Sequence, residues 1–290
     1  MPELHVSPGE DLQAVLDRAE PGTLIFLEPG VYRRKLFLRT PGLTLQGAGA
    51  DATVLSWDDY ALKKDETGRE YNTFRTWTLA VCADGVSLRD LSVVNDSGNP
   101  KLKGQEVALT VYGTDFTMEN CRLSSTQDTL FLGPLPADLI QRYQELLPPP
   151  LRRDISCRQV IRNCRIDGSV DFIFGCGDAV FESCRIHSVF DGREGGFAAA
   201  PAHALSQQEG FLFRNCEFTA DPQVRDGSIY LARPWRDYGL CRFVDCRYGP
   251  HIKPEGFDPW LDTGRDKTAR FYESPAVPGR VDWVKPQTEA

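Results

Sequence analysis

A short segment recurs six times along this chain, and it constrains the fold more than any other feature of the sequence. Each copy has a strand-like run, a corner residue that is Asn, Ser or Asp, one small or apolar residue, and a second strand-like run. The copies occupy residues 86–93, 116–123, 159–166, 179–186, 211–218 and 241–248. A β-rich unit of this size cannot bury its own apolar face, so successive units must stack. The sequence therefore predicts an all-β solenoid, a parallel β-helix, as a single domain over residues 1–290.

Five cysteines occupy one position of this repeat, directly after the corner residue. They are Cys121, Cys164, Cys184, Cys216 and Cys246. The simplest interpretation is a stacked row of small buried side chains. A ladder of disulfides or metal ligands is the alternative, but side chains in the same register point the same way, which is poor geometry for pairing. An odd total of nine cysteines also favours free thiols.

Three segments depart from the repeat. Residues 11–19 have apolar side chains at helical spacing, which predicts a short helix that caps the N-terminal end of the coil. Residues 133–156 are Pro-rich at both ends and predict an excursion with a helix over 138–147, which either walls a cleft or is decoration. The tail, residues 275–290, is expected to pack on the outside of the coils.

Two aspartates stand at equivalent positions of successive repeats. Asp128 lies seven residues after Cys121, and Asp171 lies seven residues after Cys164. Neighbouring parallel strands are about 4.8 Å apart, so the two carboxyl groups are expected side by side. One of two such carboxyl groups has a raised pKa and can act as an acid, while the other stays charged.

The charged member of the pair needs a cation, and Arg233, which a following proline holds extended, is the candidate. Asp171 is then the nucleophile and Asp128 the proton donor. A purely structural role for either acid stays open at this point. Asp191 also lies seven residues after a repeat cysteine, but its turn-like neighbours predict a loop.

Composition excludes several classes of function. A formal net charge of -8 and a pI of about 5.1 make the chain a poor nucleic-acid binder. No apolar run approaches the roughly 20 residues of a membrane helix. Residues 1–6 do not resemble a secretory signal, which predicts a cytoplasmic protein unless a leader has been removed. The scattered histidines lack metal-ligand spacing, and neither a Gly-x-Ser-x-Gly elbow nor a Gly-rich phosphate loop is present.

Four motifs, in order, resemble those of the pectin methylesterase family, in a bacterial-type form with an insertion after the second motif. They are Gln-Glu-Val-Ala-Leu at 105–109, Gln-Asp-Thr-Leu at 127–130, Gly-Ser-Val-Asp-Phe-Ile-Phe-Gly at 168–175 and Leu-Ala-Arg-Pro-Trp at 231–235. The resemblance covers about residues 29–283. It implies a right-handed parallel β-helix that hydrolyses C6 methyl esters of pectin or methylated oligogalacturonides, without a metal or other cofactor.

The same resemblance implies roles for individual residues. Asp171 corresponds to the nucleophile and Asp128 to the acid/base, Gln105 and Gln127 to the groups that stabilise the oxyanion, and Arg233 to the orienting arginine. Positions that correspond to substrate contacts are Thr73, Phe131, Phe174, Tyr230, Trp235 and Trp260. The chain departs from the family pattern at Arg34, Glu106, Ser169, Ala232 and the run 197–200.

Two other functions fit parts of the pattern. A β-helical glycoside hydrolase also uses two carboxyl groups about 5–5.5 Å apart. The paired glutamines argue against it, because a glycosidase has no carbonyl oxyanion to hold. A catalytically silent carbohydrate-binding β-helix is the third interpretation, and the intact acids and arginine argue against that. The expected partner is pectin or its methylated oligomers, with no nucleic acid and no membrane; the sequence does not predict an oligomeric state.

Overall fold

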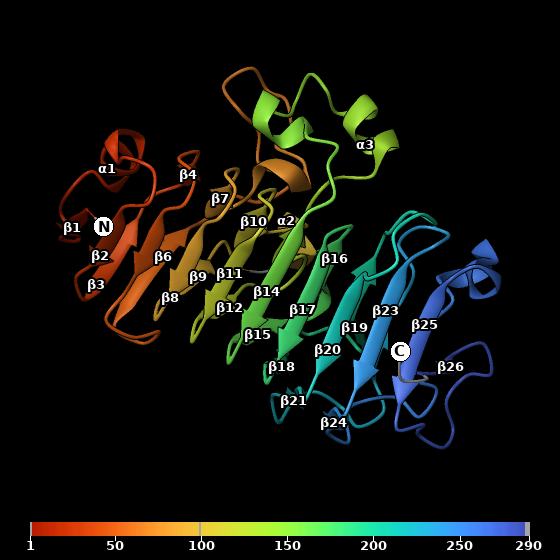
Figure 1. Ribbon diagram of the computed structural model, residues 1–290. Coiled ribbons are helices and arrows are strands. Elements are labelled where there is room, and N and C mark those ends of the chain that lie inside the picture. Colours follow the sequence, from red (N-terminus) through yellow and green to blue (C-terminus); the bar gives the residue numbers. More distant parts are fainter. Residues whose placement is uncertain (1, 99, 288–290) are drawn as a thin grey trace.

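The computed structural model describes residues 2–98 and 100–287, and in these residues every pair of neighbouring strands is parallel. The strands form three sheets that the chain visits in turn, so that each coil lies directly on the one before (Figure 1). This is the right-handed parallel β-helix that the sequence predicts.

The described residues place eleven strands in the first sheet, eight in the second and seven in the third. In spatial order the first sheet contains β1 (Glu3–Val6), β2 (Leu24–Leu27), β5 (Thr44–Gln46), β8 (Ser87–Arg89), β11 (Phe116–Glu119), β14 (Arg158–Arg162), β17 (Asp178–Glu182), β20 (Phe211–Arg214), β23 (Leu240–Val244), β25 (Arg270–Ser274) and β26 (Lys285–Pro286). The second contains β3 (Gly30–Arg33), β6 (Thr53–Trp57), β9 (Ser92–Asn95), β12 (Arg122–Ser124), β15 (Arg165–Gly168), β18 (Arg185–Ser188), β21 (Glu217–Ala220) and β24 (Arg247–Tyr248). The third contains β4 (Leu36–Leu38), β7 (Leu79–Val81), β10 (Leu109–Val111), β13 (Leu130–Leu132), β16 (Val170–Gly175), β19 (Gly196–Pro201) and β22 (Ile229–Ala232).

The corner residue of each repeat turns the chain from the first sheet into the second. All six corners have a left-handed backbone conformation, with φ between 51° and 55°: Asp90, Asn120, Asn163, Ser183, Asn215 and Asp245. Asn and Asp tolerate this conformation better than most residues do, which explains why they dominate the position. The corner therefore sets the same bend in every coil.

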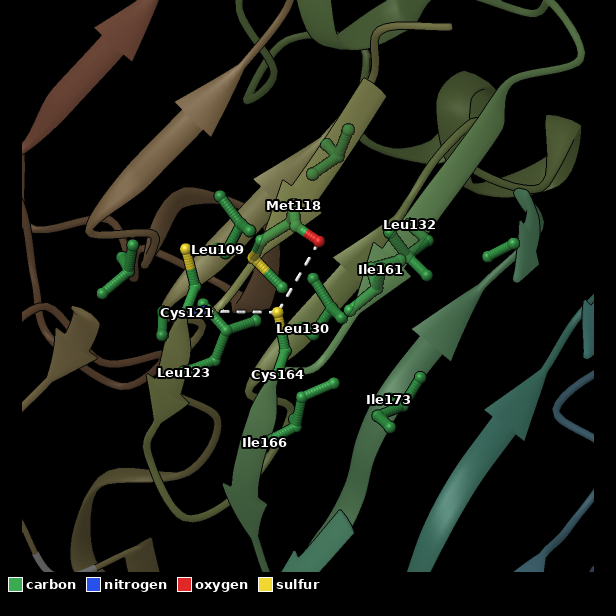
Figure 2. Close-up of a cluster of buried hydrophobic side chains, with 14 of the residues drawn as sticks. Leu109, Met118, Cys121, Leu123, Leu130, Leu132, Ile161, Cys164, Ile166 and Ile173 are labelled. Atoms are coloured by element: carbon green, nitrogen blue, oxygen red, sulfur yellow. Dashed lines mark hydrogen bonds between the residues drawn. The ribbon is translucent and has the colours of Figure 1, made fainter. Parts of the chain in front are cut away.

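The cysteines after the corners form a stacked row inside the coil, and all nine cysteines of the chain are free thiols. The thiols donate to main-chain carbonyls of the preceding coil: Cys164 to Met118 (3.6 Å), Cys184 to Ile161 (3.4 Å), Cys216 to Phe181 (3.3 Å) and Cys246 to Phe213 (3.4 Å). Figure 2 shows Cys121 and Cys164 among the leucines and isoleucines of this core. The interpretation as small buried residues is confirmed.

Both ends of the stack are covered. Helix α1 (Leu12–Arg18) begins after Asp11, whose side chain accepts a hydrogen bond from the Ala14 amide (3.0 Å), and it buries Leu12 and Leu16 in the core. The short helix predicted over 11–19 is therefore present. At the other end β26 pairs with β25, and the ring of Trp283 lies 5.4 Å from that of Phe271. The tail, described as far as residue 287, thus adds one more rung and an aromatic cover to the last coil, and residues 288–290 of the predicted tail lie outside the described residues.

Two excursions rise from the same side of the coil (Figure 1). One is the loop between β6 and β7, which contains the 3₁₀ helix η1 (Thr73–Arg75). The other joins β13 to β14 and contains α3 (Ala137–Arg142) and the 3₁₀ helix η2 (Pro149–Arg152). The helix predicted over 138–147 is shorter than expected, because the chain leaves the helical conformation at Tyr143 and turns to bury Leu147.

A second apolar cluster lies beneath these excursions, on the outer face of the third sheet. It includes Phe74, Trp77, Tyr112, Phe131, Leu139, Leu147, Leu151 and Phe174. The excursions are therefore packed onto the coil.

Further short helices are α2 (Pro100–Lys103), η3 (Leu261–Thr263) and η4 (Arg265–Lys267). Over residues 2–98 and 100–287, no helix is both long and apolar enough to cross a membrane.

The left-handed corners give a test of the fold. Asn163 is exposed at its corner with φ of 51°. Asn163→Ala should lower the free energy of unfolding by about 1 kcal/mol, because alanine adopts the left-handed conformation at a cost. Urea unfolding should show this as a lower midpoint. Asn163→Gly, which has no such penalty, is the matched control; equal midpoints for the two variants would contradict the explanation.

Candidate active site

The two aspartates lie on consecutive coils in the same register. Strands β12 and β15 pair Leu123 with Ile166, and Gln127 is bridged to Val170. The amide of Asp128 donates to the carbonyl of Val170 (3.1 Å). Both aspartates have a left-handed backbone, with φ of 65° at Asp128 and 49° at Asp171. The register predicted from the cysteine spacing is therefore present.

A backbone irregularity brings Asp171 to the surface of the third sheet. The pairing of β16 with β19 shifts between Val170 and Ile173, so Asp171 departs from the regular alternation of the strand. The bulge folds Phe172 over Gly168, where a Cβ atom would lie 2.2 Å from the Cβ of Phe172. Only glycine fits there, which explains the glycine that opens this motif.

Arg233 holds the carboxylate of Asp171 through two parallel hydrogen bonds. Its Nε donates to Oδ1 (2.8 Å) and its Nη2 to Oδ2 (2.6 Å). The guanidinium lies between two aromatic rings, 3.7 Å from the centroid of Phe197 and 3.8 Å from that of Trp260. Bidentate contact and stacking together fix the arginine in one orientation.

The two acids differ in their tendency to ionise. Burial, and then the neighbouring Asp171, raise the pKa of Asp128 well above the ordinary range of an aspartate. Burial also raises the pKa of Asp171, but the hydrogen bonds and charge of Arg233 oppose that rise. A proton shared by the pair therefore resides on Asp128, and Asp171 carries the charge.

Both predicted glutamines face the same space as the acids. The amide of Glu106 donates to the carbonyl of Gln127 (3.1 Å), which places Gln105 one coil before Gln127. The Oε1 atom of Gln127 accepts a hydrogen bond from Nη2 of Arg193 (2.8 Å). In the described part of the chain, the side-chain amide of Gln105 has no hydrogen-bond partner.

These groups line one open cavity of about 410 Å³. All five predicted catalytic residues line it. Four of the predicted substrate contacts are also there: Thr73, Phe174, Trp235 and Trp260. The cavity is walled by Asn72, Thr73 and Phe74 of one excursion and by Leu139, Arg142 and Tyr143 of the other. The excursion at 133–156 therefore forms part of a cleft.

Two predicted substrate contacts lie outside the cavity lining. Phe131 is 1% exposed, and its ring packs against Phe74, Tyr112 and Phe174 beneath the excursions. Tyr230 stacks on Phe197, with ring centroids 5.4 Å apart. Tyr230 thus supports the ring that supports Arg233. Both aromatic residues pack against neighbouring side chains where the resemblance implied contact with a sugar.

Several residues of the site were missed by reasoning from the sequence. Arg193 and Phe197 contact Gln127 and Arg233, and Phe74 and Tyr143 come from the excursions. Two of them left a signal: Arg193 lies two residues after Asp191, which register had singled out, and Phe197 opens the run 197–200, which departs from the family pattern. Asp191 does lie in a loop, as predicted.

Glu106 is a third buried carboxyl group, near the cavity that Asp128 and Asp171 line. Ser97 donates a hydrogen bond to its Oε2, and burial raises the pKa of Glu106 to about 7.

Across the described residues, no group of three or more His, Cys, Asp or Glu side chains is arranged to hold a metal ion. His203, which accepts from the Leu240 amide (3.2 Å), is structural.

The family model described as pectinesterase matches residues 7–134 and 151–284 and leaves out 135–150, which lie in the second excursion. Pectinesterase 31 of Arabidopsis thaliana is 29% identical over 256 residues, which are 87% of this chain and 72% of that protein. The chain spans 65% of the length of two further curated relatives.

Solved structures share the fold. The pectin methylesterase from carrot superposes with a TM-score of 0.82 at 24% identity, covering 100% of this chain and 89% of that one. A pectin methylesterase variant in complex with a hexasaccharide gives a TM-score of 0.78 at 22% identity, covering 97% and 89%.

The pairing of the two acids predicts a measurable coupling. Asp171→Asn should lower the pKa of Asp128, because the substitution removes a neighbouring negative charge and frees the positive charge of Arg233. Burial should still hold this pKa above the ordinary range. Carbon-13 NMR titration of the aspartate carboxyl groups would measure it. Asp221→Asn, which removes a surface carboxylate hydrogen-bonded to His187, is the control. If the pKa of Asp128 does not change in the Asp171 variant, the pairing of the two acids is contradicted.

Proposed function

This chain belongs to the pectinesterase family, and from that premise we propose that it hydrolyses C6 methyl esters of pectin or methylated oligogalacturonides. The products are a free carboxylate and methanol. One observation carries the proposal above the others: in one cavity, an aspartate anchored by an arginine lies beside a second aspartate whose pKa is strongly raised. That arrangement supplies a nucleophile and a proton donor at the same pH.

The first half of the reaction forms a covalent intermediate. The Asp171 carboxylate attacks the ester carbonyl carbon, a new C–O bond forms, and the carbonyl electron pair moves onto oxygen. Amide groups of Gln105 and Gln127 donate hydrogen bonds to this oxyanion. When the intermediate collapses, the bond to the methoxy oxygen breaks. Protonated Asp128 gives that oxygen its proton, methanol leaves, and Asp171 is left in an anhydride with the sugar acid.

The second half returns the enzyme to its starting state. Asp128, now a carboxylate, takes a proton from water as the water oxygen attacks the anhydride carbonyl. The bond between Asp171 and the sugar acid breaks, and Arg233 stabilises the carboxylate that is released. Asp128 keeps the proton for the next cycle, and the newly formed galacturonic acid loses its own proton to solvent.

A glycoside hydrolase of the same fold is the second candidate. Two carboxyl groups on adjacent coils also suit a retaining mechanism, but the two glutamine amides that line the same cavity would have no carbonyl oxyanion to stabilise in glycoside cleavage. Methanol release without new reducing ends is the outcome expected for the esterase. New reducing ends without methanol would favour the glycosidase, and binding without either product would favour a silent sugar-binding coil.

The nucleophile gives the direct test. Asp171→Asn should abolish methanol release from methylated oligogalacturonides, with kcat at least about 10⁴-fold lower, because the amide cannot attack the ester. Binding of the oligosaccharide, measured by calorimetry, should persist. Asp167→Asn is unsuitable as a control because two arginines hold its buried carboxylate. Asp115→Asn, at an exposed corner near Arg158, is the matched control. Turnover by the Asp171 variant at the wild-type rate would exclude this nucleophile.

The second excursion suggests a preference among substrates. Arg142 of α3 lines the cavity and, in the described part of the chain, has no ion-pair or hydrogen-bond partner. Arg233 and Arg236, the other arginines of the lining, are paired with Asp171 and Asp138. Arg142 is therefore the cation left to meet a free galacturonate carboxylate next to the ester under attack.

Partly de-esterified substrates should reveal this contact. Arg142→Gln should raise KM for an oligogalacturonide with a free carboxylate about two- to fivefold, the strength of a solvent-exposed ion pair. KM for the fully methylated oligomer should not change. Arg158→Gln, an exposed arginine on β14, serves as the control. Equal effects on KM for both oligomers would show that Arg142 does not recognise the free carboxylate.

A cytoplasmic location, in which imported oligomers are the substrate, stays a prediction.

A further inference from the structure

We propose that Arg193 is a positioning residue for this reaction, and that it orients the side-chain amide of Gln127 so that its NH₂ group faces the ester oxygen. This inference rests on the proposed function and deepens it. Arg193 lies outside the four motifs that relate this chain to its family. The contact that assigns the role is the hydrogen bond from Nη2 of Arg193 to Oε1 of Gln127 (2.8 Å).

The chemistry of arginine makes this contact directional. A guanidinium has only hydrogen-bond donors, so the atom of Gln127 that faces Arg193 must be the carbonyl oxygen. The NH₂ group then occupies the opposite side of the planar amide. Without a fixed donor, the two ends of a glutamine amide exchange by a simple rotation. The wrong orientation would direct a carbonyl oxygen at the developing negative charge.

Arg193 is itself held in place by two contacts with Asp191. Its main-chain amide donates to Oδ1 of Asp191 (2.9 Å), and its Nε lies 3.5 Å from Oδ2 of the same carboxylate. The hydroxyl of Ser169 donates to that Oδ2 atom at 2.6 Å. The Asp191 side chain is only 3% exposed. Ser169 lies directly before the register shift between Val170 and Ile173, so the network links the loop to the strand that carries Asp171.

The two glutamines differ in whether another side chain fixes the orientation of their amide. Gln127 is oriented by protein, whereas in the described residues Gln105 has no side-chain partner to orient its amide. The preorganised share of oxyanion stabilisation should therefore come mainly from Gln127. Donors fixed before the reaction contribute more than donors that must rotate into place, because no reorganisation is required as the charge forms.

The charge of Arg193 has a separate effect that the experiment must remove. Burial raises the pKa of both Asp128 and Asp171, and Arg193 is among the cations that oppose this rise. Loss of Arg193 would therefore also shift the pH profile. Rates of each variant are accordingly compared at that variant's own pH optimum, where this contribution is small.

A double-mutant cycle between Arg193 and Gln127 tests the assignment. Arg193→Met should lower kcat for methanol release about 10- to 100-fold while KM stays within about twofold, because the lost interaction acts on the transition state. In a Gln127→Ala background the same substitution should cost less than about threefold, since no amide remains to be oriented. Arg185→Met is the matched control, because Arg185 is a surface arginine of the same coil that pairs with Glu217.

Each outcome decides one question. If Arg193→Met lowers kcat equally in both backgrounds, or does not lower it, while its melting temperature matches the wild type, the positioning role is wrong and the proposed function stands. A wild-type protein that releases no methanol would overturn the proposed function and this inference with it. A fall in kcat confined to the background with Gln127 supports the assignment.

Discussion

Parallel backbone pairing between consecutive coils is the constraint on which the rest of this structure depends. It places equivalent residues of successive repeats side by side at about 4.8 Å, whatever the connecting loops do. The six left-handed corner residues, of which Asp90 is the first and Asp245 the last, keep the coils in the same register. The same register aligns the thiol row inside the coil and the two aspartates outside it. A slip by one residue would turn the acids inward and the core residues outward.

The site built on this register concentrates unfavourable features. Two buried carboxyl groups lie together, both on left-handed backbone, and burial of charge is costly. The arrangement limits that cost in two ways: Asp128 is neutral, and Asp171 receives two hydrogen bonds from an arginine stacked between two rings. The remaining cost is offset elsewhere, by one continuous apolar core that runs through all the coils. The outer face of the third sheet is thus free to carry chemistry.

The features that could be predicted from the sequence are those that depend on its repeat. The corner and cysteine positions recur, so the coil, the thiol row and the pairing of Asp128 with Asp171 could all be predicted from spacing. Phe131 could not be separated from Phe174 in this way, because both rings are buried on the same side of the third sheet. They differ in that Phe174 borders the cavity, whereas Phe131 is covered by Phe74 and Tyr112. Arg193 was missed because its contact to Gln127 is formed by a loop, and loops have no period to read. The helix of the second excursion was overextended because its end is set by the burial of Leu147.

The excursions are structurally separate from the coil that carries the two acids. Between β13 and β14 the chain leaves the coil for α3 and η2, and yet Phe116 of β11 pairs with Gln159 of β14 in unbroken register. The length of an excursion therefore does not change the register of the coil, because backbone pairing resumes in register at the next strand. The pectinesterase family model follows the coil on both sides and omits 135–150, the segment that supplies Leu139, Arg142 and Tyr143 to the cavity. The coil holds the acids, the glutamines and the arginine that are proposed to carry the reaction, so this wall can change in length and charge without moving them.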